Sequence, residues 1–209
     1  MSIQQFINEH LSNIIFEPPF YYNNDFSIRF ELGPPNSNID NDTYYSVVQE
    51  RILALFLAIF KEKHPVYIVG VSYEPIGDLD AYIEEEIDLL QYFADHTMNN
   101  FLYKEDYDDE TLELTGHYKF YSLECKLSEI DYIDLLGLIG GFTQKNNYLN
   151  SRIYFIDPQS QLVFHIYDDR GLDIVSPTKE ALLYLYKEFN DWILDYDRKE
   201  IDKIFKSIS

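Results

Sequence analysis

The segment YDDRGLDI at 167–174 holds the densest group of residues that could do chemistry. Its carboxylates are close enough in sequence to converge on one Mg²⁺ ion while Arg170 neutralises a phosphate, as in a metal-dependent phosphoryl-transfer or hydrolytic enzyme. The same residues also suit a turn between two strands, with Gly171 supplying a positive φ. Turn chemistry explains every residue without a cofactor, so we predict a structural turn and no metal at the three aspartates Asp168, Asp169 and Asp173.

A second acidic segment, WILDYDR at 192–198, offers two further carboxylates. Asp195 and Asp197 would add ligands to the first group if the closing helix packed beside that turn. The alternative is a helix end and a tight link, with Asp197 as the cap of the next helix, because a capping aspartate accepts hydrogen bonds from the first backbone N–H groups. We favour the capping role for Asp197.

The other reactive side chains form no complete catalytic set. The five histidines have no metal-binding spacing, and none follows a Ser or Cys in a nucleophile motif. His165 lies in a predicted strand on the face opposite Phe164 and Ile166, which predicts partial exposure. The single cysteine, Cys125, excludes an internal disulfide and is typical of a small core residue. We therefore expect no cofactor and assign no catalytic residue.

Charge is the other strong signal. The 209 residues include 37 Asp and Glu against 16 Lys and Arg, a formal net charge of -21, while 46% of the residues are hydrophobic. That much apolar material can form a core, so the chain is not a disordered acidic tail. Fourteen carboxylates and one formal cation, Lys104, lie between Glu74 and Glu113. A folded surface this negative repels nucleic acid and membranes and attracts a basic protein.

Tyrosines interleave with these carboxylates, and tyrosine is enriched at protein interfaces because it offers a large rigid area and one polar group. We predict that the acidic surface imitates a polyanionic substrate and binds a basic protein. The predicted partner-binding residues lie next to one another in the chain: Tyr103, Glu105, Asp106, Tyr107, Asp108, Asp109 and Glu110.

Hydrophobic periodicity predicts one α+β domain over residues 1–209, a mainly antiparallel sheet flanked by helices. Period-two alternation and apolar runs predict strands at 26–32, 66–73, 118–125, 153–156 and 162–167, and apolar stripes predict helices at 3–14, 43–61, 128–139, 178–194 and 197–208. An acidic, insertion-like region covers about 74–113, with apolar residues at helical spacing within 83–94 and an exposed loop at 106–113. A helical tail covers 197–209, and its apolar stripe predicts that it docks on the domain. The start of the chain lacks the features of a signal peptide, so we expect a cytoplasmic protein.

Five blocks of the sequence, ending in YDDRGLDI and WILDYDR, resemble in the same order a family of uncharacterised proteins of Bacillus-like bacteria that share a domain of unknown function. The resemblance covers nearly the whole chain and is weakest in the acidic middle. It carries over no catalytic residue. What it implies is that such genes look like passengers of polymorphic-toxin loci, in which small acidic proteins neutralise a cognate toxin. With the charge, this resemblance favours an immunity protein that blocks a basic toxin domain, for which a nuclease domain is one candidate.

Overall fold

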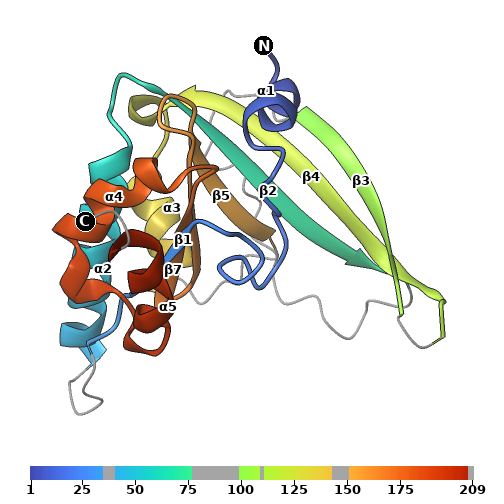
Figure 1. The fold of residues 1–209 in the computed structure, drawn as a ribbon. Helices are drawn as coiled ribbons and strands as arrows, with labels where there is room; N and C mark the ends of the chain where they lie inside the picture. Colours follow the sequence, from blue (N-terminus) through green and yellow to red (C-terminus); the bar gives the residue numbers. More distant parts are fainter. Residues whose placement is uncertain (35–40, 77–98, 109–110, 143–150, 207–209) are drawn as a thin grey trace.

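The computed structural model describes residues 1–34, 41–76, 99–108, 111–142 and 151–206. Within these residues, seven antiparallel strands form one sheet in the order β1-β7-β6-β5-β2-β4-β3 (Figure 1). The expected α+β class with an antiparallel sheet is confirmed. The strands are β1 Ser27–Glu31, β2 Pro65–Pro75, β3 Asn99–Tyr107, β4 Leu114–Lys126, β5 Ser151–Asp157, β6 Leu162–Asp168 and β7 Gly171–Val175.

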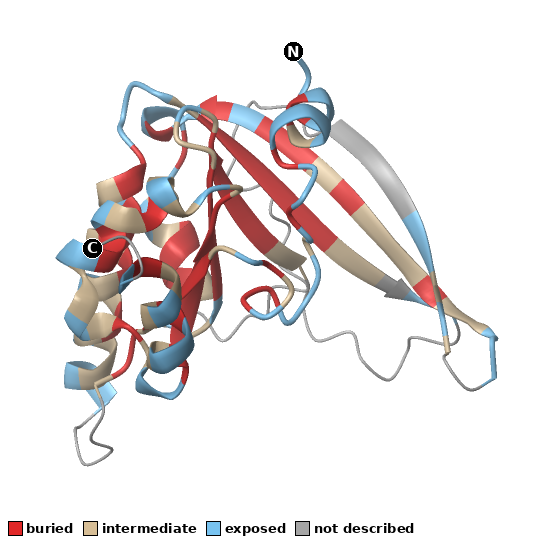
Figure 2. Ribbon diagram, in the orientation of Figure 1, coloured by how far each residue is buried: buried red, intermediate tan, exposed pale blue. Residues whose placement is uncertain are grey.

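Helices cover the two faces of the sheet unequally (Figure 1). Four of them, α2 Asn41–Ile59, α3 Tyr132–Ile139, α4 Lys179–Glu188 and α5 Asp195–Lys206, pack on one face, and α1 Ile3–His10 lies over the other. Strand alternation sets this division, because Ile28 and Phe30 enter the core under the four helices while Arg29 and Glu31 face the opposite side. Figure 2 shows the buried residues concentrated between the helices and the sheet.

Three helices differ from the prediction by several residues at one end, and the first of them, predicted over 3–14, ends at His10. The helix predicted over 178–194 ends at Glu188, and a 3-10 turn at Asn190–Trp192 follows it. The chain then runs along the outer edge of β1, where the Leu194 N–H donates to the Arg29 carbonyl at 3.0 Å. Pairing with a sheet edge requires extended backbone, and this ends the helix early. The helix predicted from 128 begins instead at Tyr132, capped by Asp131, after a 3-10 turn at Leu127–Glu129.

The acidic region is described in part. β3 and β4 form a long hairpin that projects away from the helices (Figure 1). Asp106 and Tyr107, which we expected in a loop, still belong to β3. The helical spacing noted within 83–94 lies outside the described residues. Among the described helices, none is long and apolar enough to cross a membrane.

Candidate functional site

The YDDRGLDI segment forms the turn between β6 and β7. The Asp168 carboxylate accepts the Arg170 backbone N–H at 2.8 Å and also binds the Arg170 guanidinium, so the expected turn is confirmed. The positive φ expected at Gly171 is wrong, because among the described glycines only Gly141 has one. Gly171 is instead required by space: a Cβ there would lie 1.9 Å from the Tyr167 hydroxyl.

The three aspartates of this segment do not meet. Asp173 lies across from Arg29 on the neighbouring strand, whereas Asp168 is held by Arg170 at the turn. Within the described part of the chain, no three His, Cys, Asp or Glu side chains are grouped so that they could hold a metal ion. The arrangement therefore gives no support to the metal-dependent alternative.

Arg29 and Asp173 form a buried bidentate ion pair. Nε and Nη2 of Arg29 donate to the two carboxylate oxygens at 2.7 and 2.9 Å, and the side chains are 14% and 1% exposed. Rings of Tyr21, Tyr22 and Tyr167 surround the guanidinium at 4.9–5.0 Å. Burial raises the pKa of the Asp173 carboxyl, while Arg29 and the Tyr21 N–H act to lower it. Sequence reasoning assigned Arg29 no role, although an arginine inside an alternating strand was the available signal.

Asp197 does not cap a helix, contrary to our expectation. α5 begins two residues earlier, at Asp195, so Asp197 lies in its first turn and points inward. It is 4% exposed, accepts a hydrogen bond from the Tyr22 hydroxyl at 2.9 Å, and lies 3.9 Å from Nη1 of Arg29. α5 thus brings Asp197 towards Asp173, but the Arg29 side chain lies between the two carboxylates. Asp195 remains exposed and pairs with Arg198.

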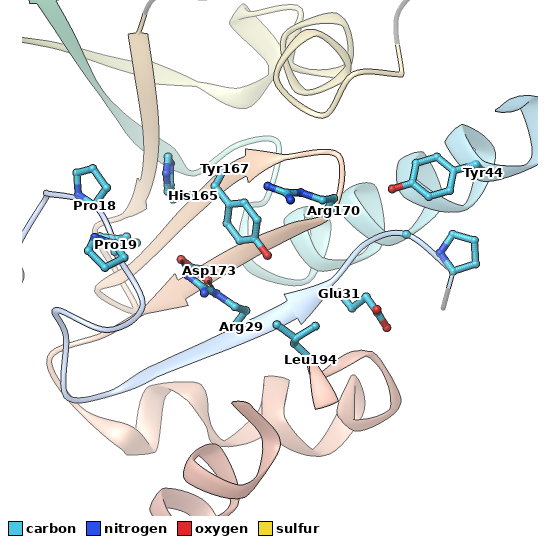
Figure 3. Close-up of a pocket in the computed structure, with 13 residues that line it drawn as sticks. Pro18, Pro19, Arg29, Glu31, Tyr44, His165, Tyr167, Arg170, Asp173 and Leu194 are labelled. Atoms are coloured by element: carbon cyan, nitrogen blue, oxygen red, sulfur yellow. Dashed lines mark hydrogen bonds and ion pairs between the residues drawn. The ribbon is translucent and has the colours of Figure 1, made fainter. Parts of the chain in front are cut away.

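A cavity of about 720 Å³ opens over this part of the sheet (Figure 3). Arg29 and Glu31 of β1 border it on one side, and side chains of β6 and β7 border it on the other. Apolar and aromatic side chains make up most of the rest of its lining: Pro18, Pro19, Phe20, Pro34, Tyr44, Tyr167 and Leu194.

His165 lines the same cavity and is more buried than we predicted, at 6% exposure. Its face of the sheet is covered by the segment before β1: the Phe20 ring lies edge-on at 5.6 Å, and Tyr154 stacks at 4.5 Å. Nδ1 donates to the Ile153 carbonyl at 2.9 Å. Burial lowers the pKa of His165 to about 4, so the ring is neutral at pH 7.

The predicted partner-binding residues lie at the end of the β3–β4 hairpin. Glu105 and Tyr107 are exposed there and hydrogen-bond to each other. Asp106 and Asp108 are half-buried and accept hydrogen bonds from Thr115 of β4 and Thr111 of the turn, respectively. Asp109, Glu110 and the side chain of Tyr103 lie outside the described residues.

Apolar side chains also project at this end of the hairpin, and sequence reasoning missed two of them. Leu112 is 76% exposed, Ile76 53% and Tyr107 49%. Leu112 has a φ of 57°, a left-handed conformation that costs a residue with a Cβ about 1–2 kcal/mol. A leucine inside an acidic run was the signal for Leu112. We define Ile76, Tyr107 and Leu112 as the apolar tip.

Cys125 is buried, as predicted, and burial raises the pKa of its thiol to about 12. The thiolate that reactive cysteines need is therefore disfavoured at neutral pH.

Comparisons with known proteins give a family and one relative. The family described as Domain of unknown function (DUF3885) matches residues 3–197. The chain is 22% identical over 213 residues to the Uncharacterized protein YnaE of Bacillus subtilis (strain 168), covering 94% of this chain and 99% of that protein. No solved structure matches the chain significantly.

Proposed function

The chain belongs to the family described as Domain of unknown function (DUF3885), and we propose that it is an acidic binding protein that docks a basic protein on the end of its β3–β4 hairpin. The observation that carries the proposal is the apolar tip, in which Tyr107 and Leu112 of the projecting hairpin and Ile76 at the end of the neighbouring strand β2 are exposed among carboxylates. In a bacterial toxin locus this would make it an immunity protein, with a toxin nuclease domain as the expected partner.

The apolar tip costs free energy in the isolated chain. Leu112 combines a left-handed backbone with a largely exposed apolar side chain, so it has no stabilising contact of the usual core kind. Such features persist at interaction sites, where a partner covers the apolar surface and compensates for the strain. Burying these side chains against a partner would slow dissociation.

The surrounding charge selects the partner. From Glu105 to Glu113 the sequence has six carboxylates and no Lys or Arg. Lys104, just before this stretch, forms an ion pair with Glu17. Negative charge at the end of the β3–β4 hairpin attracts a basic surface from a distance, so electrostatics would set the association rate.

The test uses purified products of the genes adjacent to this one, with binding to the chain followed by stopped-flow fluorescence. We expect a basic partner whose association rate falls steeply as salt rises, because exposed charges are screened within about 8–10 Å. Leu112→Asn should raise the dissociation rate about tenfold or more, through loss of apolar contact. Glu105→Gln with Glu113→Gln should mainly slow association.

Gln161 provides a matched control for Leu112. It has a φ of 58° in the β5–β6 turn, so Gln161→Asn relieves a similar backbone conformation at a polar site away from the hairpin. That variant should bind the partner as the wild type does. An acidic partner, or association that is indifferent to salt, would contradict the proposal. Turnover of a phosphorylated small molecule with no protein partner would favour the enzyme alternative at Asp168, Asp169 and Asp173.

A further inference from the structure

The cavity beside Arg29 takes no part in the proposed docking, because it lies over β1, β6 and β7 and not over the β3–β4 hairpin. Its volume of about 720 Å³ falls within the range of about 300–1,000 Å³ that is usual for small-molecule sites. Proline and aromatic side chains form much of its wall, and Figure 3 shows Pro18 and Pro19 on one side with Tyr44 at the far end. The site has the size and the apolar lining of a ligand pocket.

The charged groups around the cavity already have partners within the chain. Arg29 is bound by Asp173 through two hydrogen bonds, and Arg170 is bound by Asp168. The Glu31 carboxylate interacts electrostatically with Arg51, which also donates a hydrogen bond to the Glu31 backbone carbonyl at 2.8 Å. A charged ligand would have to compete with these contacts, and an anion would also be repelled by the net charge of -21. The cavity therefore favours an uncharged ligand.

His165 supplies the polar group that gives such a ligand an orientation. A carbonyl oxygen can only accept, so the contact with Ile153 places the ring proton on Nδ1 and leaves the lone pair on Nε2. No described residue donates a hydrogen bond to Nε2. The ring lines the cavity, and His165 is 6% exposed. Nε2 is reachable from the cavity, so a ligand N–H or O–H that enters can donate a hydrogen bond to it.

We propose that this cavity binds a small uncharged aromatic molecule that donates an N–H or O–H hydrogen bond to Nε2 of His165. The rings of Phe20 and Tyr167 and the faces of Pro18 and Pro19 enclose its apolar body, since these side chains line the cavity around the histidine. The proposal is independent of protein docking at the hairpin.

Indole and 1-methylindole are a matched pair of probes, because they share an aromatic body and differ in the N–H donor. Titrations followed by ¹H–¹⁵N NMR should show saturable shifts for residues around the cavity with indole. Binding of 1-methylindole should be about tenfold weaker, since it leaves the acceptor unsatisfied. Tryptamine and indole-3-acetate, which add a positive and a negative charge, should also bind more weakly.

Leu194→Trp tests the location by filling the cavity from its wall, and Leu57→Trp places the same side chain at an exposed site on α2. Indole binding should be lost in the first variant and unchanged in the second, with folding of both checked by circular dichroism. The proposal would be overturned by equal binding of the two indoles, by tighter binding of a charged derivative, or by no saturable binding to the wild type. If a variant does not fold, the comparison of indole with 1-methylindole on the wild type still tests the proposal. Association with the basic partner is a separate measurement, so the two proposals fail independently.

Discussion

Arg29 is the residue at which distant parts of the chain meet. It lies on β1, its carboxylate partner Asp173 is 144 residues away on β7, and Asp197 of α5 lies 3.9 Å from its third nitrogen. Removing one member of a buried pair leaves the other charge without compensation, which is why such pairs hold neighbouring elements in one arrangement. The ion pair therefore ties the first strand to the last strand, and Asp197 places α5 against them.

Gly171 should be sensitive to substitution because of Tyr167. Gly171→Ala places a methyl group where the Tyr167 hydroxyl lies, so we expect a loss of about 1–3 kcal/mol in the free energy of unfolding. In a Tyr167→Ala background the loss should shrink, although the Phe30 carbonyl, 2.8 Å from the same methyl position, keeps part of it. Urea denaturation of the four proteins of this double-mutant cycle measures the coupling, and strictly additive losses would contradict the explanation.

His165 should make stability depend on pH. The pKa of the buried ring is about 4, below its ordinary value of 6.5, so between these values the unfolded chain binds a proton that the folded chain does not. The free energy of unfolding should therefore fall by up to about 3 kcal/mol as pH drops from 6.5 to 4, and this contribution is fully present above pH 6.5.

His165→Asn separates this effect from the titration of carboxylates, because the amide can still donate to the Ile153 carbonyl. Urea denaturation at pH 4 to 8 should show a shallower pH dependence for the variant between 6.5 and 4. Identical profiles for the two proteins would show that His165 is not the group responsible.

At the scale of elements, α5 is part of the core and not a loose tail. Ile201 is fully buried and Phe205 stacks on Tyr186 of α4 at 4.6 Å, which confirms the expected docking of this helix. The segment before it covers the outer edge of β1, through a bridge between Phe30 and Ile193. Covering an edge strand satisfies its backbone groups and blocks pairing with another chain.

Deleting residues 197–209 should destabilise the protein by about 4 kcal/mol, from the loss of the two buried apolar side chains of Ile201 and Phe205 at about 2 kcal/mol each. The melting temperature of the truncated chain should fall accordingly. Lys203→Ala is a suitable control, because its ion pair with Glu200 is exposed and contributes little. An unchanged melting temperature after truncation would mean that α5 does not stabilise the domain.

For the whole molecule, net charge acts in opposite directions on folding and on binding. A charge of -21 repels itself in the compact state, and salt screens that repulsion. We expect the melting temperature to rise as NaCl increases from 0.05 to 0.5 M, because the Debye length falls from above roughly 10 Å to below roughly 8 Å over this range. KCl should act equally if screening is the cause, and a response to one salt alone would indicate specific ion binding. Over the same range, association with a basic partner should slow.

Local patterns in the sequence determined the α+β class, the strands other than β3, the described helices apart from their ends, the turn at Asp168 and the acidic character. These depend on residues within a few positions of one another, so alternation and capping chemistry are enough to predict them. The interpretation of Asp168 as a turn residue was of this local kind and agrees with the structure.

Tertiary structure alone decided how β1, β7 and α5 meet. Alternation places Arg29, Asp173 and His165 each on one face of its own strand, but only the strand order β1-β7-β6 sets them side by side. The burial of His165 likewise depends on Phe20, which arrives from a loop nearly 150 positions away. Period-two alternation shows which side chains share a face of the sheet. The segments that pack on that face are remote in sequence, so the cavity and the inward orientation of Asp197 could not be predicted.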